Sequence, residues 1–242
     1  MIKNKTALIT GSTKGIGSQI GIDLLQKNYF VYFNYANDVE SAQELQSYLD
    51  KEGYSNKFVI LQGNLSIYEE AQYFLDKIHN NLDCIVFNVG ITDRTTFGEI
   101  NIEEWDKVFR TNLTIPFFML QGLKDRINEN GRIIFVTSIS GIIPDATSIS
   151  YGVSKASENM LVKYLAKEFA PRKITINAIA PGYVMTDWHK GKSGDQIKRI
   201  ANKSLLKRFA TPKEIAKSVM MVIENDYITG QIIRVDGGFG LA

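Results

Sequence analysis

Tyr151 and Lys155 are the residues whose types and spacing best suit proton transfer. A separation of four places both side chains on one face of a helix. A free tyrosine hydroxyl ionises near pH ~10, and a neighbouring ammonium group favours its phenolate form. The pair therefore predicts a general acid–base unit that works near neutral pH.

The spacing is not specific by itself. With 11 tyrosines and 28 lysines and arginines in 242 residues, about one Tyr-x-x-x-Lys/Arg match is expected by chance. Tyr73 and Lys77 form a second match, which we interpret as surface packing. Ser138 distinguishes the first pair, because it ends an expected strand shortly before Tyr151, and its hydroxyl can hydrogen-bond a substrate carbonyl there. A serine at a strand end also suits a simple turn.

A glycine-rich loop with the pattern Gly-x-x-x-Gly-x-Gly follows the first expected strand and enters a helix. Glycines let the backbone approach a pyrophosphate, and the helix N-terminus offers free N–H groups and a partial positive charge. The position of the loop in the chain makes it specific, since its spacing is not the common Gly-x-Gly-x-x-Gly. We expect a dinucleotide to contact Gly11, Ser12, Thr13, Lys14, Gly15, Ile16 and Gly17.

The end of the second expected strand bears on which dinucleotide binds. NAD-selective proteins place an acid there, on the ribose hydroxyls. This strand ends at Tyr35, and the first acid after it is Asp38. Lys14 adds a cation close to where a 2′-phosphate would lie, although it also suits a solvated loop charge. We therefore expect NADP(H) as the cofactor, with NAD(H) as the alternative.

These residues need a scaffold that positions them, and strand-like runs alternate with helical patterns along the whole chain. This alternation predicts a Rossmann-like doubly wound parallel sheet of about seven strands, with helices on both faces. The expected strands are Ala7–Thr10, Phe30–Tyr35, Phe58–Gln62, Cys84–Asn88, Arg132–Ser138, Thr175–Ala180 and Ile232–Val235. The expected helices are Ile16–Lys27, Glu40–Glu52, Tyr68–Ile78, Ile102–Asn128, Ser154–Phe169 and Pro212–Glu224.

The domain organisation follows from the absence of any linker or repeat. A chain of 242 residues, 44% of them hydrophobic, suits one α/β domain over residues 1–242. The charged, glycine-containing stretch from Asp187 to Asn202 interrupts the alternation after the sixth expected strand. Because ligands bind beyond the carboxyl ends of parallel strands, we expect an irregular substrate lid over 187–202, or else a plain surface loop.

Composition excludes several classes of partner. A net charge of +2 gives no general attraction to nucleic acid or anionic membranes, and no apolar stretch approaches the ~20 residues of a membrane span. Residues 1–5 lead directly into a strand-like run instead of a signal-peptide core, so we expect a cytoplasmic protein with Cys84 as a buried thiol. His79 and His189 have no partners that would make a zinc site, so no metal is expected.

In their order along the whole chain, these motifs resemble those of the short-chain dehydrogenase/reductase family. The resemblance rests on the glycine loop, Asn88-x-Gly90, Asn112, Ser138, Tyr151-x-x-x-Lys155, Asn177–Gly182 and Ile228–Gly238. It implies an oxidoreductase that transfers a hydride between NADP(H) and a carbonyl or alcohol. Tyr151 would exchange the proton, Ser138 would polarise the carbonyl, and Lys155 would assist Tyr151 and bind the nicotinamide ribose.

The resemblance also implies the rest of the site. Asn112 would hold a water that links Lys155 to solvent. The cofactor site would include Asn34, Asn64, Leu65, Asn88, Gly90, Pro181, Gly182, Tyr183, Val184 and Thr186. Two positions depart from the family pattern: Val89 replaces a common alanine, and Asn64 replaces a common aspartate.

Within the family, the chain is most similar to 3-oxoacyl-[acyl-carrier-protein] reductases of fatty-acid biosynthesis. This implies a substrate on acyl carrier protein, an acidic partner that Arg172 would help to dock. Glu129 stands where those reductases often carry a base, which opposes an acidic partner. A small ketone, sugar or other secondary alcohol is the alternative substrate.

A non-catalytic NADP(H)-binding regulator or scaffold is a reading of a different class. Loss of Tyr151 or Lys155 would favour it, and both are present. The helical stretches around Trp105–Leu123 and after Tyr151 carry wide apolar faces. In this family such helices pack between subunits, so a homotetramer is expected, with burial inside one subunit as the alternative.

Overall fold

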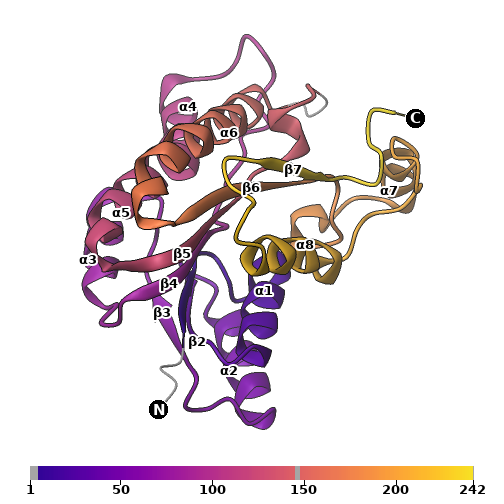
Figure 1. Ribbon diagram of the computed structural model, residues 1–242. Coiled ribbons are helices and arrows are strands. Elements are labelled where there is room, and N and C mark those ends of the chain that lie inside the picture. The colour runs from indigo at the N-terminus through magenta and orange to yellow at the C-terminus, as the bar shows by residue number, and fades with distance from the viewer. Residues whose placement is uncertain (1–4, 145–147, 242) are drawn as a thin grey trace.

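The computed structural model describes residues 5–144 and 148–241 and shows one parallel sheet between two layers of helices (Figure 1). The strand order is β3-β2-β1-β4-β5-β6-β7, and every neighbouring pair is parallel. The strands are β1 (Thr6–Ile9), β2 (Phe30–Tyr35), β3 (Phe58–Gln62), β4 (Leu82–Phe87), β5 (Ile127–Val136), β6 (Thr175–Pro181) and β7 (Ile232–Val235). The helices are α1 (Gly15–Gln26), α2 (Val39–Lys51), α3 (Tyr68–Asp76), α4 (Ile102–Phe109), α5 (Ile115–Leu123), α6 (Ile149–Phe169), α7 (Gly194–Ala201) and α8 (Pro212–Glu224). The expected fold class is confirmed.

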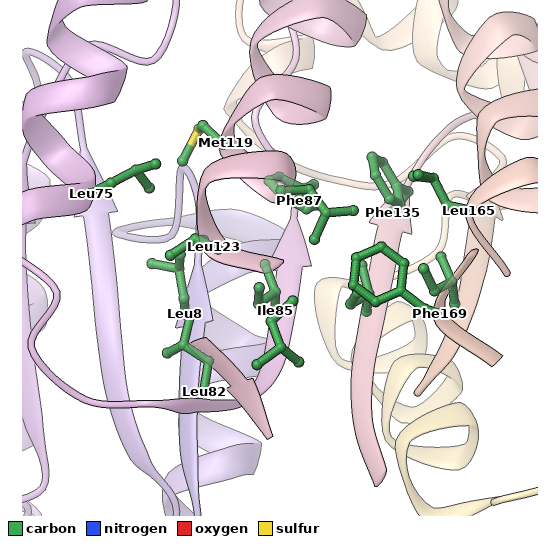
Figure 2. Close-up of a cluster of buried hydrophobic side chains, with 14 of the residues drawn as sticks. Leu8, Leu75, Leu82, Ile85, Phe87, Met119, Leu123, Phe135, Leu165 and Phe169 are labelled. Atoms are coloured by element: carbon green, nitrogen blue, oxygen red, sulfur yellow. The ribbon is translucent and has the colours of Figure 1, made fainter. Parts of the chain in front are cut away.

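Two hydrophobic cores lie on opposite faces of the sheet. Along β1, Leu8 points to one core while Ala7 and Ile9 point to the other, because side chains alternate along a strand. Helices α1, α2 and α8 cover one face, and α3, α5 and α6 cover the other (Figure 1). Figure 2 shows the core on the side of α3, α5 and α6, where side chains of β1, β4 and β5 lie next to Met119, Leu123, Leu165 and Phe169.

The strand order creates a switch point between β1 and β4 at the centre of the sheet. The chain builds outward from β1 to β3, then returns to add β4 on the other side of β1. The loops that follow β1 and β4 therefore lead to opposite faces and leave a crevice at the carboxyl ends of these strands. Dinucleotides bind at such a point in open α/β sheets.

The expected helix Ile102–Asn128 is wrong as one continuous element. Helix α4 ends at Phe109, a π-helical turn spans Arg110–Thr114, and α5 then begins with Pro116 in its first turn. Strand β5 already begins at Ile127, which pairs with Leu82 of β4. Apolar periodicity runs across all these pieces, and a pairing with a distant strand leaves no local signal.

Two further helix boundaries differ from the sequence prediction. Helix α6 begins at Ile149, five residues before Ser154, because the Ser148 side chain caps it. The expected irregular stretch between Asp187 and Asn202 contains α7, which begins with a capping box of Ser193 and Gln196. The glycines and charged residues around this short helix obscured its start in the sequence pattern.

Among the described residues no helix is long and apolar enough to cross a membrane. Residues 1–4, on which the signal-peptide prediction partly rests, lie outside the described residues.

Candidate active site

The loop after β1 is shaped for close approach of a phosphate. Gly11 and Gly15 have φ angles of 57° and 61°, in the left-handed region that favours glycine. A Cβ at Gly17 would lie 2.7 Å from the Gly11 carbonyl oxygen. No side chain caps the first turn of α1, and that turn carries no acid. Its N–H groups therefore suit an anion, and the loop fits the pyrophosphate of a dinucleotide.

Two asparagines hold this loop from neighbouring strands. The Asn34 side chain in β2 is buried; its Oδ1 accepts a hydrogen bond from Gly11 N at 3.0 Å, and its Nδ2 donates to the carbonyl oxygen of Gly63 at 3.0 Å. Asn88, which follows β4, donates from Nδ2 to the Gly11 carbonyl oxygen at 2.7 Å. Val89 leaves no room for a side chain at Gly11, since its Cγ2 would lie 2.8 Å from a Cβ at that position.

Ser138, Tyr151 and Lys155 line one cavity of about 830 Å³ together with the glycine loop. Ser138 follows the carboxyl end of β5, and Tyr151 lies in the first turn of α6. Ser148 fixes that turn by accepting a hydrogen bond from Tyr151 N at 3.3 Å. Other expected site residues on the cavity wall are Gly11, Lys14, Gly15, Ile16, Asn88, Gly90, Pro181, Gly182, Tyr183, Val184 and Thr186.

Lys155 is buried behind Tyr151. Its Nζ lies 5.9 Å from the centre of the Tyr151 ring and donates to the Val136 carbonyl oxygen at 3.2 Å. The same nitrogen lies 2.8 Å from Oε2 of Glu158, a buried carboxylate that sequence reasoning missed. The signal available in the sequence was spacing, because Glu158 follows Lys155 by three positions and shares its helix face.

Asn112 connects the cavity walls without lining the cavity. It lies in the π-helical turn and is fully buried. Its Oδ1 accepts from Ile91 N at 2.9 Å, and its Nδ2 donates to the Ile91 carbonyl oxygen at 3.0 Å and to Ser154 Oγ at 2.9 Å. The side chain thus joins the loop after β4 to α6, and these bonds occupy both of its ends.

Several expected cofactor residues do not line this cavity. Ser12 Oγ accepts from Asn34 N, and Asn64 Oδ1 accepts from both the backbone and the hydroxyl of Ser66. Leu65 packs in the core under β2 and α3. Contact of these residues with a cofactor stays a prediction; the ones absent from the cavity wall are Ser12, Thr13, Gly17, Asn34, Asn64 and Leu65.

Lys14 is closely paired with acids. Its Nζ lies 2.5 Å from Asp38 Oδ2 and 3.5 Å from Asp187 Oδ2. The hydrogen bond to Asp38 raises the pKa of Lys14, and the same bond is the main cause that lowers the pKa of Asp38. About half of the Lys14 side chain is exposed, so solvent screens this pair. A phosphate at this position would compete with Asp38 for the cation.

The segment after β6 closes one side of the cavity. The centres of the Trp188 and Tyr151 rings are 5.9 Å apart, and Arg199 and Ile200 of α7 line the cavity wall. Burial, then the charges of Lys192 and Arg94, lower the pKa of His189 to about 4. Sequence reasoning missed Arg94, Trp188 and Arg199 as wall residues, because no motif marks them; the role of 187–202 as a lid stays a prediction.

The second Tyr-x-x-x-Lys match lies on the surface. The Tyr73 side chain on α3 is 67% exposed, and Lys77 Nζ lies 5.0 Å above its ring while donating to the Gln62 carbonyl oxygen. Neither residue lines the cavity. The interpretation of this pair as surface packing is confirmed.

Sequence comparison gives relatives over nearly the whole chain. A family model described as enoyl-(acyl carrier protein) reductase matches residues 11–240. The 3-oxoacyl-[acyl-carrier-protein] reductase FabG of Staphylococcus epidermidis is 32% identical over 242 residues, which cover 97% of this chain and 98% of the relative. FabG of Buchnera aphidicola subsp. Schizaphis graminum is 33% identical over 242 residues, with 98% of each chain covered.

Solved structures share the architecture. BdcA in complex with NADPH is 28% identical, with a TM-score of 0.87 over 98% of this chain and 94% of that chain. The angucycline C-6 ketoreductase LanV with bound NADP is 25% identical, with a TM-score of 0.92 over 98% of this chain and 96% of that chain. The extent of these matches and the arrangement of the cavity lead to one conclusion: the chain belongs to the short-chain dehydrogenase/reductase family and is an oxidoreductase.

Proposed function

We propose that this enzyme is an NADP(H)-dependent carbonyl reductase whose substrate is a 3-oxoacyl group on acyl carrier protein, reduced to the 3-hydroxyacyl form. One observation carries the reaction: Ser138, Tyr151 and Lys155 line the same cavity as the glycine loop. The names of the relatives at 32% and 33% identity support the substrate.

The cavity residues divide the chemistry among them. Bound NADPH supplies the hydride. Ser138 Oγ donates a hydrogen bond to the substrate carbonyl oxygen, and Tyr151 transfers its proton to that oxygen. Lys155 stabilises the phenolate that remains. Asn112 contributes by fixing Ile91 and Ser154, since its side chain bonds both backbone groups of Ile91 and the Ser154 hydroxyl.

The end of β2 supports NADP(H) over NAD(H). No carboxylate lies in β2, and Asp38 caps α2 by accepting a hydrogen bond from Ser41 N at 3.0 Å. Its other oxygen is engaged with Lys14, so the acid is directed at a protein cation. The NADPH- and NADP-bound relatives among the solved structures support the same choice.

Cations on the cavity wall support an acidic carrier protein as partner. Arg94, Lys192 and Arg199 border the cavity, and an anionic partner would be drawn to them. Arg172 does not border the cavity. It lies just beyond the far end of α6, so the length of the helix, about 30 Å, separates it from Tyr151. Its guanidinium donates to the carbonyl oxygens of Lys124 and Ile127. Docking at the cavity of the same chain therefore rests on the first three residues.

A reductase assay tests this proposal. NADPH consumption is followed with acetoacetyl-acyl carrier protein, with acetoacetyl-pantetheine as the matched substrate that lacks the protein, and with small ketones and sugars. We expect the highest kcat/KM with the carrier protein. Equal kcat/KM with and without the protein would overturn the carrier as partner, and reduction of none of these compounds would overturn the reaction.

We also propose that subunits associate through α6. Ile149, Val153, Met160 and Tyr164 are each more than 40% exposed and recur on one face of this helix. A stripe of that kind on a 21-residue helix suits a two-fold contact with a second copy. The family resemblance extends this to a homotetramer.

A further inference from the structure

Glu158 is a buried carboxylate that the proposed reaction does not use. Its side chain is 3% exposed, on the same face of α6 as Lys155. Glu158 Oε1 accepts a hydrogen bond from Lys155 Nζ at 3.1 Å, and Oε2 lies 2.8 Å from the same nitrogen. Oε2 has no hydrogen-bond partner in the described part of the chain. The Lys155 ammonium is therefore the group that stabilises this buried carboxylate.

The other charged side chains on α6 and on the elements packed against it lie away from Lys155 and Glu158. Strand β6 and the turn Ile139–Gly141, which both pack against α6, carry no ionisable side chain. The Arg110 side chain is exposed and donates to the Ser66 carbonyl oxygen, and Arg172 binds backbone carbonyls at the far end of α6. The remaining charged groups on α4 and α6 lie toward solvent: Glu103, Glu104, Asp106, Lys107, Lys163, Lys167 and Glu168.

Burial raises the pKa of Glu158 to about 7, and the nearby charge of Lys155 limits that rise. Buried ion pairs recover little net energy, because desolvation of both groups opposes their attraction. An apolar side chain at this position would extend the packing made by Val162 and Leu165 on the same helix. Glu158 is thus better explained by what it does to Lys155 than by stability.

Tyr151 and Glu158 both interact with the positive charge of Lys155. The ammonium group favours the Tyr151 phenolate, and a carboxylate 2.8 Å from that ammonium offsets part of its field. The same carboxylate holds Nζ at the buried face of α6, where the carbonyl oxygen of Val136 in β5 also accepts a hydrogen bond from it. Both effects act on Tyr151 through Lys155.

Building on the proposed function, we propose that Glu158 is a positioning residue that fixes the Lys155 ammonium behind Tyr151 and, by offsetting its charge, moves the working pH range of Tyr151 upward. The carboxylate touches neither substrate nor cofactor in this role. Its negative charge is the property that matters, so an amide of the same shape should not replace it.

The test is a titration that needs no substrate. Ultraviolet absorbance follows phenolate formation in the protein, and the same curve for Tyr151→Phe is subtracted, which isolates Tyr151. The subtraction is repeated in the Glu158→Gln and Glu158→Leu backgrounds. We expect the midpoint of Tyr151 ionisation to fall by about one pH unit in both, since each removes the negative charge.

Two further variants control for packing and for remote charge. Glu158→Asp keeps the charge and should keep the midpoint near that of the unchanged protein, whereas Glu168→Gln removes an exposed charge on α6 and should leave it unchanged. An unchanged midpoint in both Glu158→Gln and Glu158→Leu would overturn the proposal, as would an equal shift in Glu158→Asp. Circular dichroism confirms that each variant is folded.

This titration uses no substrate, so a protein that reduces no carbonyl compound can still show the shift in the Tyr151 midpoint. Failure of this inference is thereby separated from failure of the proposed function.

Discussion

Tyr151 and Tyr73 each precede a lysine by four positions, and their surroundings differ at every point. Tyr151 faces the cavity with Ser138, and its lysine is buried. Tyr73 is exposed, and Lys77 only crosses its ring while bonding a backbone oxygen. At the residue scale, a functional tyrosine is thus defined by the groups that strand β5 and helix α6 bring to it.

Replacing Tyr151 by Phe removes only the hydroxyl. We expect kcat for carbonyl reduction to fall by about 10²- to 10⁴-fold, the usual contribution of a general acid, while NADPH affinity changes little. Steady-state kinetics and fluorescence titration measure the two quantities. Tyr73→Phe is the matched control and should leave both unchanged. Full activity in Tyr151→Phe would show that another group supplies the proton.

Asp38 limits what Lys14 can offer to a cofactor. Asp38→Asn keeps a side chain that can cap α2 but removes the charge that pairs with Lys14. We expect the Kd for NADPH to fall about threefold to fivefold, with little change for NADH, because the pair is exposed and weak. Fluorescence titrations with both cofactors check this.

Asp187→Asn serves as the comparison for that variant. Asp187 lies 3.5 Å from Lys14 and also pairs with Lys190 at 2.9 Å, so its removal should tighten NADPH less than removal of Asp38. Equal tightening of NADPH and NADH in Asp38→Asn would mean that Lys14 does not meet the 2′-phosphate.

At the scale of elements, the π-helical turn between α4 and α5 carries Asn112 into the interior. Such turns are rare and often lie at functional sites. The turn allows one side chain to bond both backbone groups of Ile91 and the Ser154 hydroxyl. The loop after β4, helix α6 and the α4–α5 segment are thereby held together around the cavity.

Asn112→Ala should loosen this junction. It leaves the N–H of Ile91 and its carbonyl unpaired in a partly buried place and removes the donor to the buried Ser154 hydroxyl, and we expect the free energy of unfolding to fall by about 2 to 4 kcal/mol. Urea unfolding followed by circular dichroism measures it. Asn101→Ala, which removes the exposed cap of α4, is the control and should cost about 1 kcal/mol. A smaller loss at Asn112 than at Asn101 would contradict the role of Asn112 as a junction.

The elements that sequence reasoning predicted well are those with local signals. The alternation of strands with helices and the glycine loop define the sheet and its first turn, and both are observed. The break at Arg110 and the early start of β5 at Ile127 depend on contacts with Ile91 and Leu82, which are distant in sequence. Glu158 lies only three positions from Lys155, but it escaped notice because the sequence does not show which face of α6 is buried.

At the scale of the whole molecule, the sheet order brings the site together. Residues from the loops after β1, β4, β5 and β6 line one cavity because all these strands are parallel and end at the same edge (Figure 1). Helix α6 contributes Tyr151 and Lys155 to the cavity and exposes an apolar stripe on another face. One helix therefore serves both the chemistry and the proposed contact between subunits.

Charges placed on that stripe should separate the subunits. Met160 and Tyr164 are 52% and 66% exposed, one turn apart and away from the cavity. In a two-fold contact each substitution appears twice, so Met160→Glu with Tyr164→Glu brings four acids into one apolar interface. Size-exclusion chromatography with light scattering should show a tetramer for the unchanged chain and a smaller species for the variant. Tyr73→Glu, at an exposed tyrosine on α3, should leave the mass of the assembly unchanged. A monomer in the unchanged chain, or a tetramer that survives both glutamates, would mean that α6 does not form the interface.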